Sequence, residues 1–394
     1  MPSIRLPTAV GHLAEYRLQG PREFPPKAVG AFNRVAYAAA HVVADPLADV
    51  DPWLEVAIDW ERTIAFREHL WHLGLGVAEA MDTAQRGMGL DWPASLELIR
   101  RSLAAARARP GALIACGAGT DHLTPAPDLT VDDVIGAYEE QIEAIEALDG
   151  RIILMASRAL AACAGSPDDY AKVYDRILSQ LRQPCIIHWL GEMFDPALEG
   201  YFGYRDHMAA MDVCVDVIAA NVSKVDGIKL SLLDKDKEIA LRARLPAGVR
   251  MYTGDDFNYA LLIAGDGERY SDALLGIFDP IAPAASAALS ALAEGRTAAF
   301  HEILAPTVPL SRHVFKAPTR FFKTGVVFMA YLNGHQDHFT MVGGQESARS
   351  TLHLAELFRL ADAAGLLRDP DLAVARMRRV LAVRGIEAVV CASV

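Results

Sequence analysis

Short apolar runs alternate along this chain with longer segments in which apolar residues recur every three or four positions. Short continuous runs are typical of strands buried on both faces, and the longer periodicity is typical of helices with one buried face. The sequence predicts eight such strands, at residues 35–43, 75–80, 112–116, 151–156, 185–189, 227–230, 249–253 and 274–278.

Helices are predicted between most of these strands, and helix-start signals support three of them. Pro93 suits a first helical turn, Thr130 with Asp133 forms a capping pattern, and Ser166 precedes Pro167. Repeated strand–helix units of this kind imply an α/β fold with a closed parallel barrel, the (β/α)₈ TIM barrel. A doubly wound sheet is the alternative, but residues 41–45 after the first strand contain no glycine-rich loop.

The chain outside the barrel divides into two parts. Residues 1–30 contain Pro7, Pro21, Pro25 and Pro26, and we expect an irregular N-terminal extension there. The barrel is expected over residues 31–294. Residues 295–394 read as helices that pack beside the barrel or over its mouth, with a loop at 333–345.

Composition narrows the class of protein. The formal net charge of -12 disfavours binding to nucleic acid or to an anionic membrane. The first twenty residues do not resemble a signal peptide, and no apolar stretch is long enough to span a membrane. Five widely spaced cysteines favour reduced thiols and a cytoplasmic location. We therefore expect a small-molecule partner, and also a homo-oligomer.

Polar residues follow nearly every predicted strand. In barrels of this kind the active site lies at the C-terminal ends of the strands. Any one of these residues could be a surface residue or a helix cap, but their recurrence indicates a site. They are His41, Glu79, Asp82, Thr83, Asp121, His122, Ser157, Arg158, His188, Trp189, Glu192, Lys229, Ser231, Asp255 and Asp256.

Lys229 is the most informative of them because it lies inside an apolar strand. It could be a lysine whose ammonium group reaches the rim of the barrel. Alternatively, it is a desolvated amine that attacks a carbonyl to form a Schiff base. Burial disfavours the charged form of lysine and makes the neutral, nucleophilic amine available near neutral pH.

Two segments carry a resemblance to a known family. Residues 226–231 read DGIKLS, and residues 253–256 read TGDD. These segments resemble the G-[IV]-K and S-G-[DN]-[DE] motifs of the dihydrodipicolinate synthase/N-acetylneuraminate lyase family. Residues 261–283 and 322–325 are similar to its eighth strand and to the start of its C-terminal helices. The resemblance implies a divergent class I aldolase barrel in which Lys229 forms the Schiff base.

The chain departs from that family at two positions. The family's G-T-T-G-E motif, which grips a pyruvyl carboxylate, corresponds to residues 81–85. Thr83 matches the second threonine, but Asp82 replaces the first and would repel a carboxylate. The family's strand-four tyrosine is absent near Arg158, which could bind an anion instead. His188 could then serve as the acid/base group with a pKa near neutrality, unless it is a hydrogen-bonded core residue.

The candidate pocket is rich in carboxylates, which can accept hydrogen bonds from sugar hydroxyls or bind a divalent metal together with histidines. His335, Asp337 and His338 could add ligands, although a role in the loop alone is the simpler interpretation. We predict a Schiff-base lyase that acts on a keto sugar or sugar-derived keto acid by retro-aldol cleavage or dehydration, without metal or cofactor. Lys229, His188 and Arg158 are its predicted catalytic residues. The predicted substrate-binding residues are Glu79, Asp82, Thr83, Asp121, Glu192, Ser231, Gly254, Asp255 and Asp256.

Two alternatives remain open from the sequence. The first is a metal-dependent sugar isomerase, epimerase or aldolase, with His188, Glu79 and Asp255 or Asp256 as ligands. The second is a sugar-binding barrel without catalytic activity. A buried Lys229 counts against the second, because binding alone needs no desolvated amine.

Overall fold

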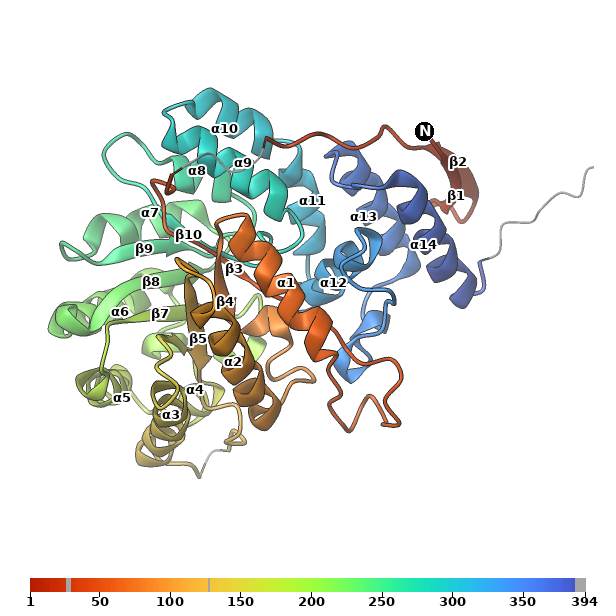
Figure 1. Cartoon of the computed structure of the whole chain (residues 1–394). Helices are drawn as coiled ribbons and strands as arrows, with labels where there is room; N and C mark the ends of the chain where they lie inside the picture. Colours follow the sequence, from red (N-terminus) through yellow and green to blue (C-terminus); the bar gives the residue numbers. More distant parts are fainter. Residues whose placement is uncertain (26–29, 127, 387–394) are drawn as a thin grey trace, which may run out of the picture.

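A closed barrel of parallel strands forms the centre of the molecule (Figure 1). The computed structural model describes residues 1–25, 30–126 and 128–386. Within this part the strand order is β10-β3-β4-β5-β6-β7-β8-β9, so the predicted (β/α)₈ barrel is confirmed. The strands are β3 (Ala36–Ala39), β4 (Gly76–Glu79), β5 (Ile114–Ala118), β6 (Ile152–Met155), β7 (Cys185–Leu190), β8 (Val225–Ser231), β9 (Arg250–Thr253) and β10 (Asp272–Leu275).

Helices follow the strands around the outside of the barrel. The capping box that Thr130 and Asp133 form at α3 is present, as predicted. A helix after β8 was not predicted, because its sequence KDKEIALRAR is dominated by charges that mask the apolar periodicity. The helices are α1 (Trp60–His72), α2 (Trp92–Arg107), α3 (Val131–Glu146), α4 (Arg158–Cys163), α5 (Pro167–Gln180), α6 (His207–Ala220), α7 (Lys235–Arg244), α8 (Tyr259–Ala264) and α9 (Ala282–Ala293).

We expected an irregular N-terminal extension, but part of it is regular. Strands β1 (Ser3–Pro7) and β2 (Leu13–Arg17) pair as an antiparallel hairpin. Ile4 and Leu6 bury their side chains, while Arg5 between them is exposed. The hairpin packs on the C-terminal helices, and Asp362 accepts a hydrogen bond of 2.7 Å from the Tyr16 hydroxyl. Tertiary contact therefore orders a proline-containing segment.

The C-terminal segment is helical, as expected, and one of its helices reaches the barrel. Every residue of α12 is buried, and the helix contacts the short 3-10 helix η1 (Asp82–Ala84) that follows β4. Figure 1 shows α13 and α14 farther from the barrel than α12. The helices are α10 (Thr297–Leu304), α11 (Thr307–Val314), α12 (Phe322–Leu332), α13 (Thr351–Ala363) and α14 (Pro370–Val383).

Side-chain alternation along the strands decides what faces the barrel axis. Tyr37, Ile153, Ile186 and Tyr252 belong to the cluster that fills the interior. His188, Lys229 and Tyr252 lie side by side on β7, β8 and β9. Because successive residues point to opposite faces of a strand, His188 is directed inward two positions after Ile186. The strands thus carry His188 and Lys229 to the C-terminal mouth of the barrel.

No helix in the described ranges has the length and apolar character needed to cross a membrane. Cys116, Cys163, Cys185 and Cys214 are free thiols, as predicted, and all but Cys163 are buried. Cys391 lies outside the described residues.

Candidate active site

A narrow cavity at the C-terminal mouth of the barrel surrounds Lys229, whose side chain is only 7% exposed. Segments from across the fold contribute to it, including the C-terminal helices. Its lining consists of Ala39, Met81, Asp82, Thr83, Leu190, Phe194, Lys229, Ser231, Asp256, Gly276, Phe315 and Phe322.

The aromatic wall of this cavity keeps water away from the amine. Phe315 and Phe322 stack with their ring centroids 4.5 Å apart, and Phe194 lies 6.2 Å from Phe322. Burial lowers the pKa of Lys229, while the negative charges of Asp82 and Asp256 act in the opposite direction. No hydrogen bond or ion pair from the described residues engages the Lys229 amine. The amine is therefore available to a ligand, and its neutral form is favoured relative to that of an exposed lysine.

Gly254 allows the turn after β9 to approach Lys229 closely. A Cβ atom at this position would lie 2.9 Å from Lys229 Cε and 2.3 Å from Ser231 Oγ. It would also lie 2.7 Å from the Leu230 carbonyl oxygen, which is backbone and cannot move aside easily. Only glycine fits without displacing the lysine, so this residue shapes the cavity and need not contact a substrate itself.

Asp256 places a buried carboxyl group in the same cavity as the lysine. Its side chain is buried and accepts a hydrogen bond of 2.9 Å from the Ile277 backbone N–H. Burial raises the pKa of Asp256 to about 7, although the Ile277 N–H and the positive charge of Lys229 oppose the rise. A carboxyl group with this pKa can both give and take a proton near neutral pH.

His188 is present at the site but differs from the expectation. It is fully buried, its Nε2 lies 3.2 Å from Ser231 Oγ, and Nδ1 has no partner among the described residues. Burial, and secondarily the charge of Lys229, lower the pKa of His188 well below its ordinary value. The predicted pKa near neutrality is therefore wrong: His188 is a neutral imidazole, and Asp256 is better matched to acid–base work at neutral pH.

A wider, cationic cavity of about 320 Å³ continues from the lysine cavity. Asp82, Leu190, Phe194 and Phe322 line both cavities. The charged residues around the wider cavity are Asp82, Arg86, Arg158, Asp195, Arg320 and Lys323.

Arg158 lies in this cavity and forms an ion pair with Asp195. The sequence analysis suggested that Arg158 binds an anion, and the cavity that it lines contains more cationic than anionic side chains. Lys323 on α12 is buried, and burial lowers its pKa to about 8. Lys323 and Arg320 did not emerge as candidates from the sequence. The segment 322–325 was recognised there as family-like, but only the packing of α12 brings it to the barrel mouth.

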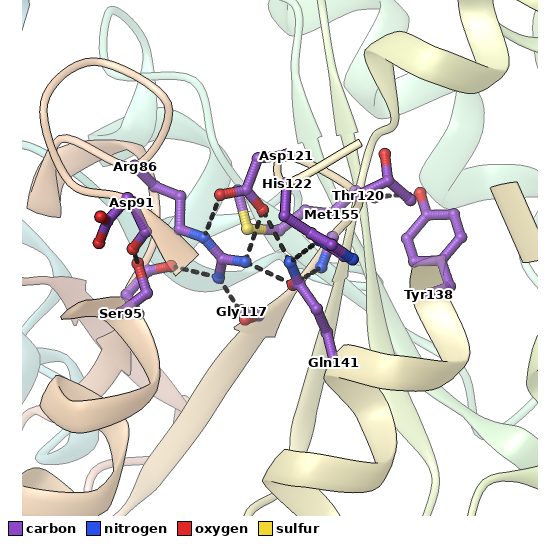
Figure 2. Close-up of polar contacts among 12 residues, drawn as sticks. Arg86, Asp91, Ser95, Gly117, Thr120, Asp121, His122, Tyr138, Gln141 and Met155 are labelled. Atoms are coloured by element: carbon purple, nitrogen blue, oxygen red, sulfur yellow. Dashed lines mark hydrogen bonds and ion pairs between the residues drawn. The ribbon is translucent and has the colours of Figure 1, made fainter. Parts of the chain in front are cut away.

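Asp121 also lies at the mouth, and Arg86 holds it there (Figure 2). Arg86 donates to both oxygens of Asp121 at 2.6 and 3.0 Å, and Gln141 Nε2 donates to Asp121 Oδ1 at 3.0 Å. Although burial acts in the opposite direction, Arg86 lowers the pKa of Asp121. Arg86 also donates to the carbonyl oxygen of Gly117 at 2.6 Å. The network joins the loops after β4 and β5, so Asp121 positions the wall of the pocket.

Five of the predicted substrate-binding residues line neither cavity: Asp121 and Gly254, described above, and Glu79, Glu192 and Asp255. Glu79 points out of the barrel to Arg67 of α1, at 2.8 and 2.9 Å. Glu192 contacts His207, with its Oε2 3.1 Å from His207 Nε2. Asp255 accepts hydrogen bonds from Asn258 and from the backbone N–H of Phe257. Strand alternation and local capping explain where these side chains point. The position of a residue at the end of a predicted strand does not reveal this direction.

The candidate metal ligands are not brought together. In the described part of the chain, no three His, Cys, Asp or Glu side chains converge in a way that could hold a metal ion. In the loop at 333–345, Asp337 pairs with Arg62 and Arg376, and the His335 ring packs 4.8 Å from that of His69. These loop residues pack among other parts of the chain and line neither cavity.

The pH dependence of amine reactivity should report on this electrostatic setting. We expect reductive trapping at Lys229 to rise with pH and to level off below the pKa of a free lysine, about 10.4. Asp82→Asn removes a negative charge that favours the ammonium form, so its midpoint should move to lower pH. The measurement is the initial rate of adduct formation between about pH 6 and pH 10, with folding checked at each pH.

Glu192→Gln is the matched control, because Glu192 is also an acidic residue after a strand but lies outside the cavity. Its midpoint should stay at the wild-type value. An unchanged midpoint in Asp82→Asn, or a shift to higher pH, would show that Asp82 does not act on the amine.

Nearly the whole chain matches one known protein family. This family, described as "Protein of unknown function (DUF993)", matches residues 4–386. No curated protein matches the chain. Solved structures of similar fold include dihydrodipicolinate synthases from Oceanobacillus iheyensis and Thermotoga maritima. The first is 15% identical, with a TM-score of 0.60 over 83% of this chain and 96% of the other. The second is 15% identical, with a TM-score of 0.61 over 86% and 100%.

A dihydrodipicolinate synthase family protein from Coccidioides immitis is 16% identical, with a TM-score of 0.56 over 91% of this chain and 97% of the other. At these identities the comparison establishes a shared fold, and the resemblance of fold expected from the sequence is confirmed.

Proposed function

The chain belongs to the DUF993 family and has the fold of dihydrodipicolinate synthase, and from these premises we propose that it is a class I, Schiff-base-forming lyase. The observation that carries the proposal is Lys229, a buried amine with a lowered pKa in a narrow cavity at the barrel mouth. A structural lysine would need no such cavity. A purely binding protein would gain nothing from a desolvated amine.

The reaction proceeds through an iminium. The neutral Lys229 amine attacks the substrate carbonyl, and loss of water gives the iminium, which withdraws electrons from the adjacent carbon. Removal of a proton from a hydroxyl group one carbon further on breaks the bond between these two carbons, releases a carbonyl compound as the first product and leaves an enamine on Lys229. Protonation of the enamine and hydrolysis release the second product. Asp256 carries the protons, because its pKa of about 7 suits both directions of transfer.

The charges around Lys229 restrict the substrate. Asp82 lies close enough to act on the lysine and would repel an acid group directly attached to the reacting carbonyl. The cationic cavity beyond it, with Arg158, Arg320 and Lys323, suits an acid group at the far end of the substrate. We therefore propose that the substrate is a sugar-derived keto acid or a keto sugar that carries an acid group. The acid group lies several bonds away from the reacting carbonyl.

The substrate is identified by trapping. Purified protein is incubated with a panel of keto sugars and 2-oxo acids, reduced with borohydride and read by intact mass. A substrate leaves a stable secondary amine on the protein, and peptide mapping locates it. If no carbonyl compound in the panel is captured, while the protein is shown to be folded, the Schiff-base proposal fails.

Pyruvate should be a poor ligand. It carries its carboxylate next to the carbonyl, where Asp82 stands in place of the threonine found in the family motif. Asp82→Thr should therefore increase capture of pyruvate by at least about tenfold, as expected from relief of roughly 1.4 kcal/mol of repulsion. The measurement is the concentration dependence of borohydride trapping. Capture of pyruvate by the wild-type protein in the submillimolar range would disprove this role of Asp82.

The activity should not depend on a divalent metal. An iminium and a Lewis-acidic metal perform the same task of withdrawing electrons from a carbonyl, and a site rarely needs both. We expect EDTA-treated protein to keep most of its lyase activity on the trapped substrate. Loss of activity that manganese, zinc or magnesium restores would instead favour the metal-dependent alternative.

A further inference from the structure

A second cavity, of about 420 Å³, lies outside the barrel and shares no lining residue with the lysine cavity. It is bounded by α1, the turn after β10, the end of α12 and the N-terminal arm, which converge from distant parts of the sequence. Its volume falls within the range of small-molecule pockets in proteins, about 300–1,000 Å³.

A buried carboxylate oxygen in this cavity lacks a partner. Asp279 is 3% exposed, and its Oδ2 accepts hydrogen bonds from the backbone N–H of His41 at 2.8 Å and contacts His41 Nδ1 at 2.7 Å. Its Oδ1 is buried with no hydrogen-bond partner among the described residues. Because buried polar atoms are nearly always satisfied in folded proteins, this oxygen indicates a missing hydrogen-bond donor.

The rest of the cavity offers apolar surface, two arginines and one further carboxylate, that of Glu23. Phe24, Phe66 and Met329 provide an apolar body. Arg22 and Arg368 each donate a hydrogen bond from one guanidinium nitrogen to a backbone carbonyl oxygen, at 3.2 and 2.8 Å. Each has further N–H groups to donate.

Two imidazoles complete the lining without adding charge. His69 and His335 pack with their ring centroids 4.8 Å apart, and Phe66 meets His335 edge-on at 5.0 Å. Burial lowers the pKa of both histidines, that of His335 to about 3. The rings are therefore neutral at physiological pH and, tilted against one another and against Phe66, form part of an aromatic wall.

We propose that this cavity is a binding site for a small aromatic acid that also carries an amino or hydroxyl group. The ring would lie among Phe24, Phe66 and Met329. The acid group would bind Arg22 and Arg368, and the donor would satisfy Asp279 Oδ1. The proposal is independent of the chemistry at Lys229.

The test uses two probes, L-phenylalanine and 4-hydroxyphenylacetate, which place the donor and the acid either on one carbon or at opposite ends of the ring. We expect at least one to bind the full-length protein with one-to-one stoichiometry in calorimetry. The double substitution Arg22→Gln/Arg368→Gln should weaken that binding at least about tenfold, because it removes charge-assisted hydrogen bonds. Arg368 is exposed and Arg22 is only partly buried, so the variant should fold.

Arg320→Gln, which removes an exposed cation from the other cavity, is the matched control and should leave binding unchanged. Failure of both probes to bind up to about 10 mM, a negligible affinity, would overturn the proposal. So would equal weakening by Arg320→Gln. Equally tight binding of 3-phenylpropionate, which has the ring and the acid but no donor, would overturn the role given to Asp279.

Discussion

Replacing Lys229 with alanine should abolish covalent capture of substrate and lower lyase activity by at least about a thousandfold, since the residue that forms the covalent intermediate is lost. No other group among the residues that line the cavity can form an iminium. The expected readout is intact mass after borohydride treatment, with the adduct present in the wild-type protein and absent in Lys229→Ala. Thermal unfolding should show that the variant is folded.

Lys323→Ala is the matched control for this experiment. Lys323 is also buried at the barrel mouth and also has a lowered pKa, but it donates a hydrogen bond of 3.1 Å to the Arg320 carbonyl oxygen and lies in the cationic cavity. Its substitution should weaken substrate binding and leave covalent capture intact. An adduct that maps to Lys323, or full activity in Lys229→Ala, would contradict the assignment of the nucleophile.

Replacing Arg67 with methionine should destabilise the protein by about 3–5 kcal/mol, as expected when one partner of a buried ion pair is removed. Arg67 and Glu79 are both fully buried and joined by two charge-assisted hydrogen bonds. The substitution leaves the Glu79 carboxylate without its counter-charge in the interior. Denaturant unfolding followed by fluorescence measures the loss.

The double variant Arg67→Met/Glu79→Leu separates the ion pair from the packing. Because it removes both charges, it should recover most of the stability lost in the single variant. A further variant, Glu79→Gln, tests the predicted role of Glu79 in substrate binding. Unchanged unfolding and a strongly raised KM in this variant would show that Glu79 binds the substrate. Reduced stability with an unaltered KM supports the structural role.

Several features of this protein were already determined by the local sequence. The apolar runs that form β3 to β9 are buried on both faces in the barrel, so composition alone marks them as strands. The capping box at Thr130 is a local interaction and was predicted from residues three positions apart. Lys229 stood out because burying a charged residue in an apolar strand is costly, so its presence there favours a functional role.

Other features depended on which residues become neighbours in space. Lys323 reaches the active-site mouth only because α12 folds back against the turn at Asp82. The neutral state of His188 follows from complete burial beside Lys229, and the raised pKa of Asp256 follows mainly from burial.

The direction of Glu79 was also a matter of tertiary structure, because the sequence places it at a strand end without revealing which face of the barrel it occupies. Arg67, twelve positions earlier in the chain, becomes its partner only when α1 packs on β4. Local sequence determined the strands and singled out Lys229, whereas the charge states and partners around them arise from burial and from long-range contacts that only the folded chain creates.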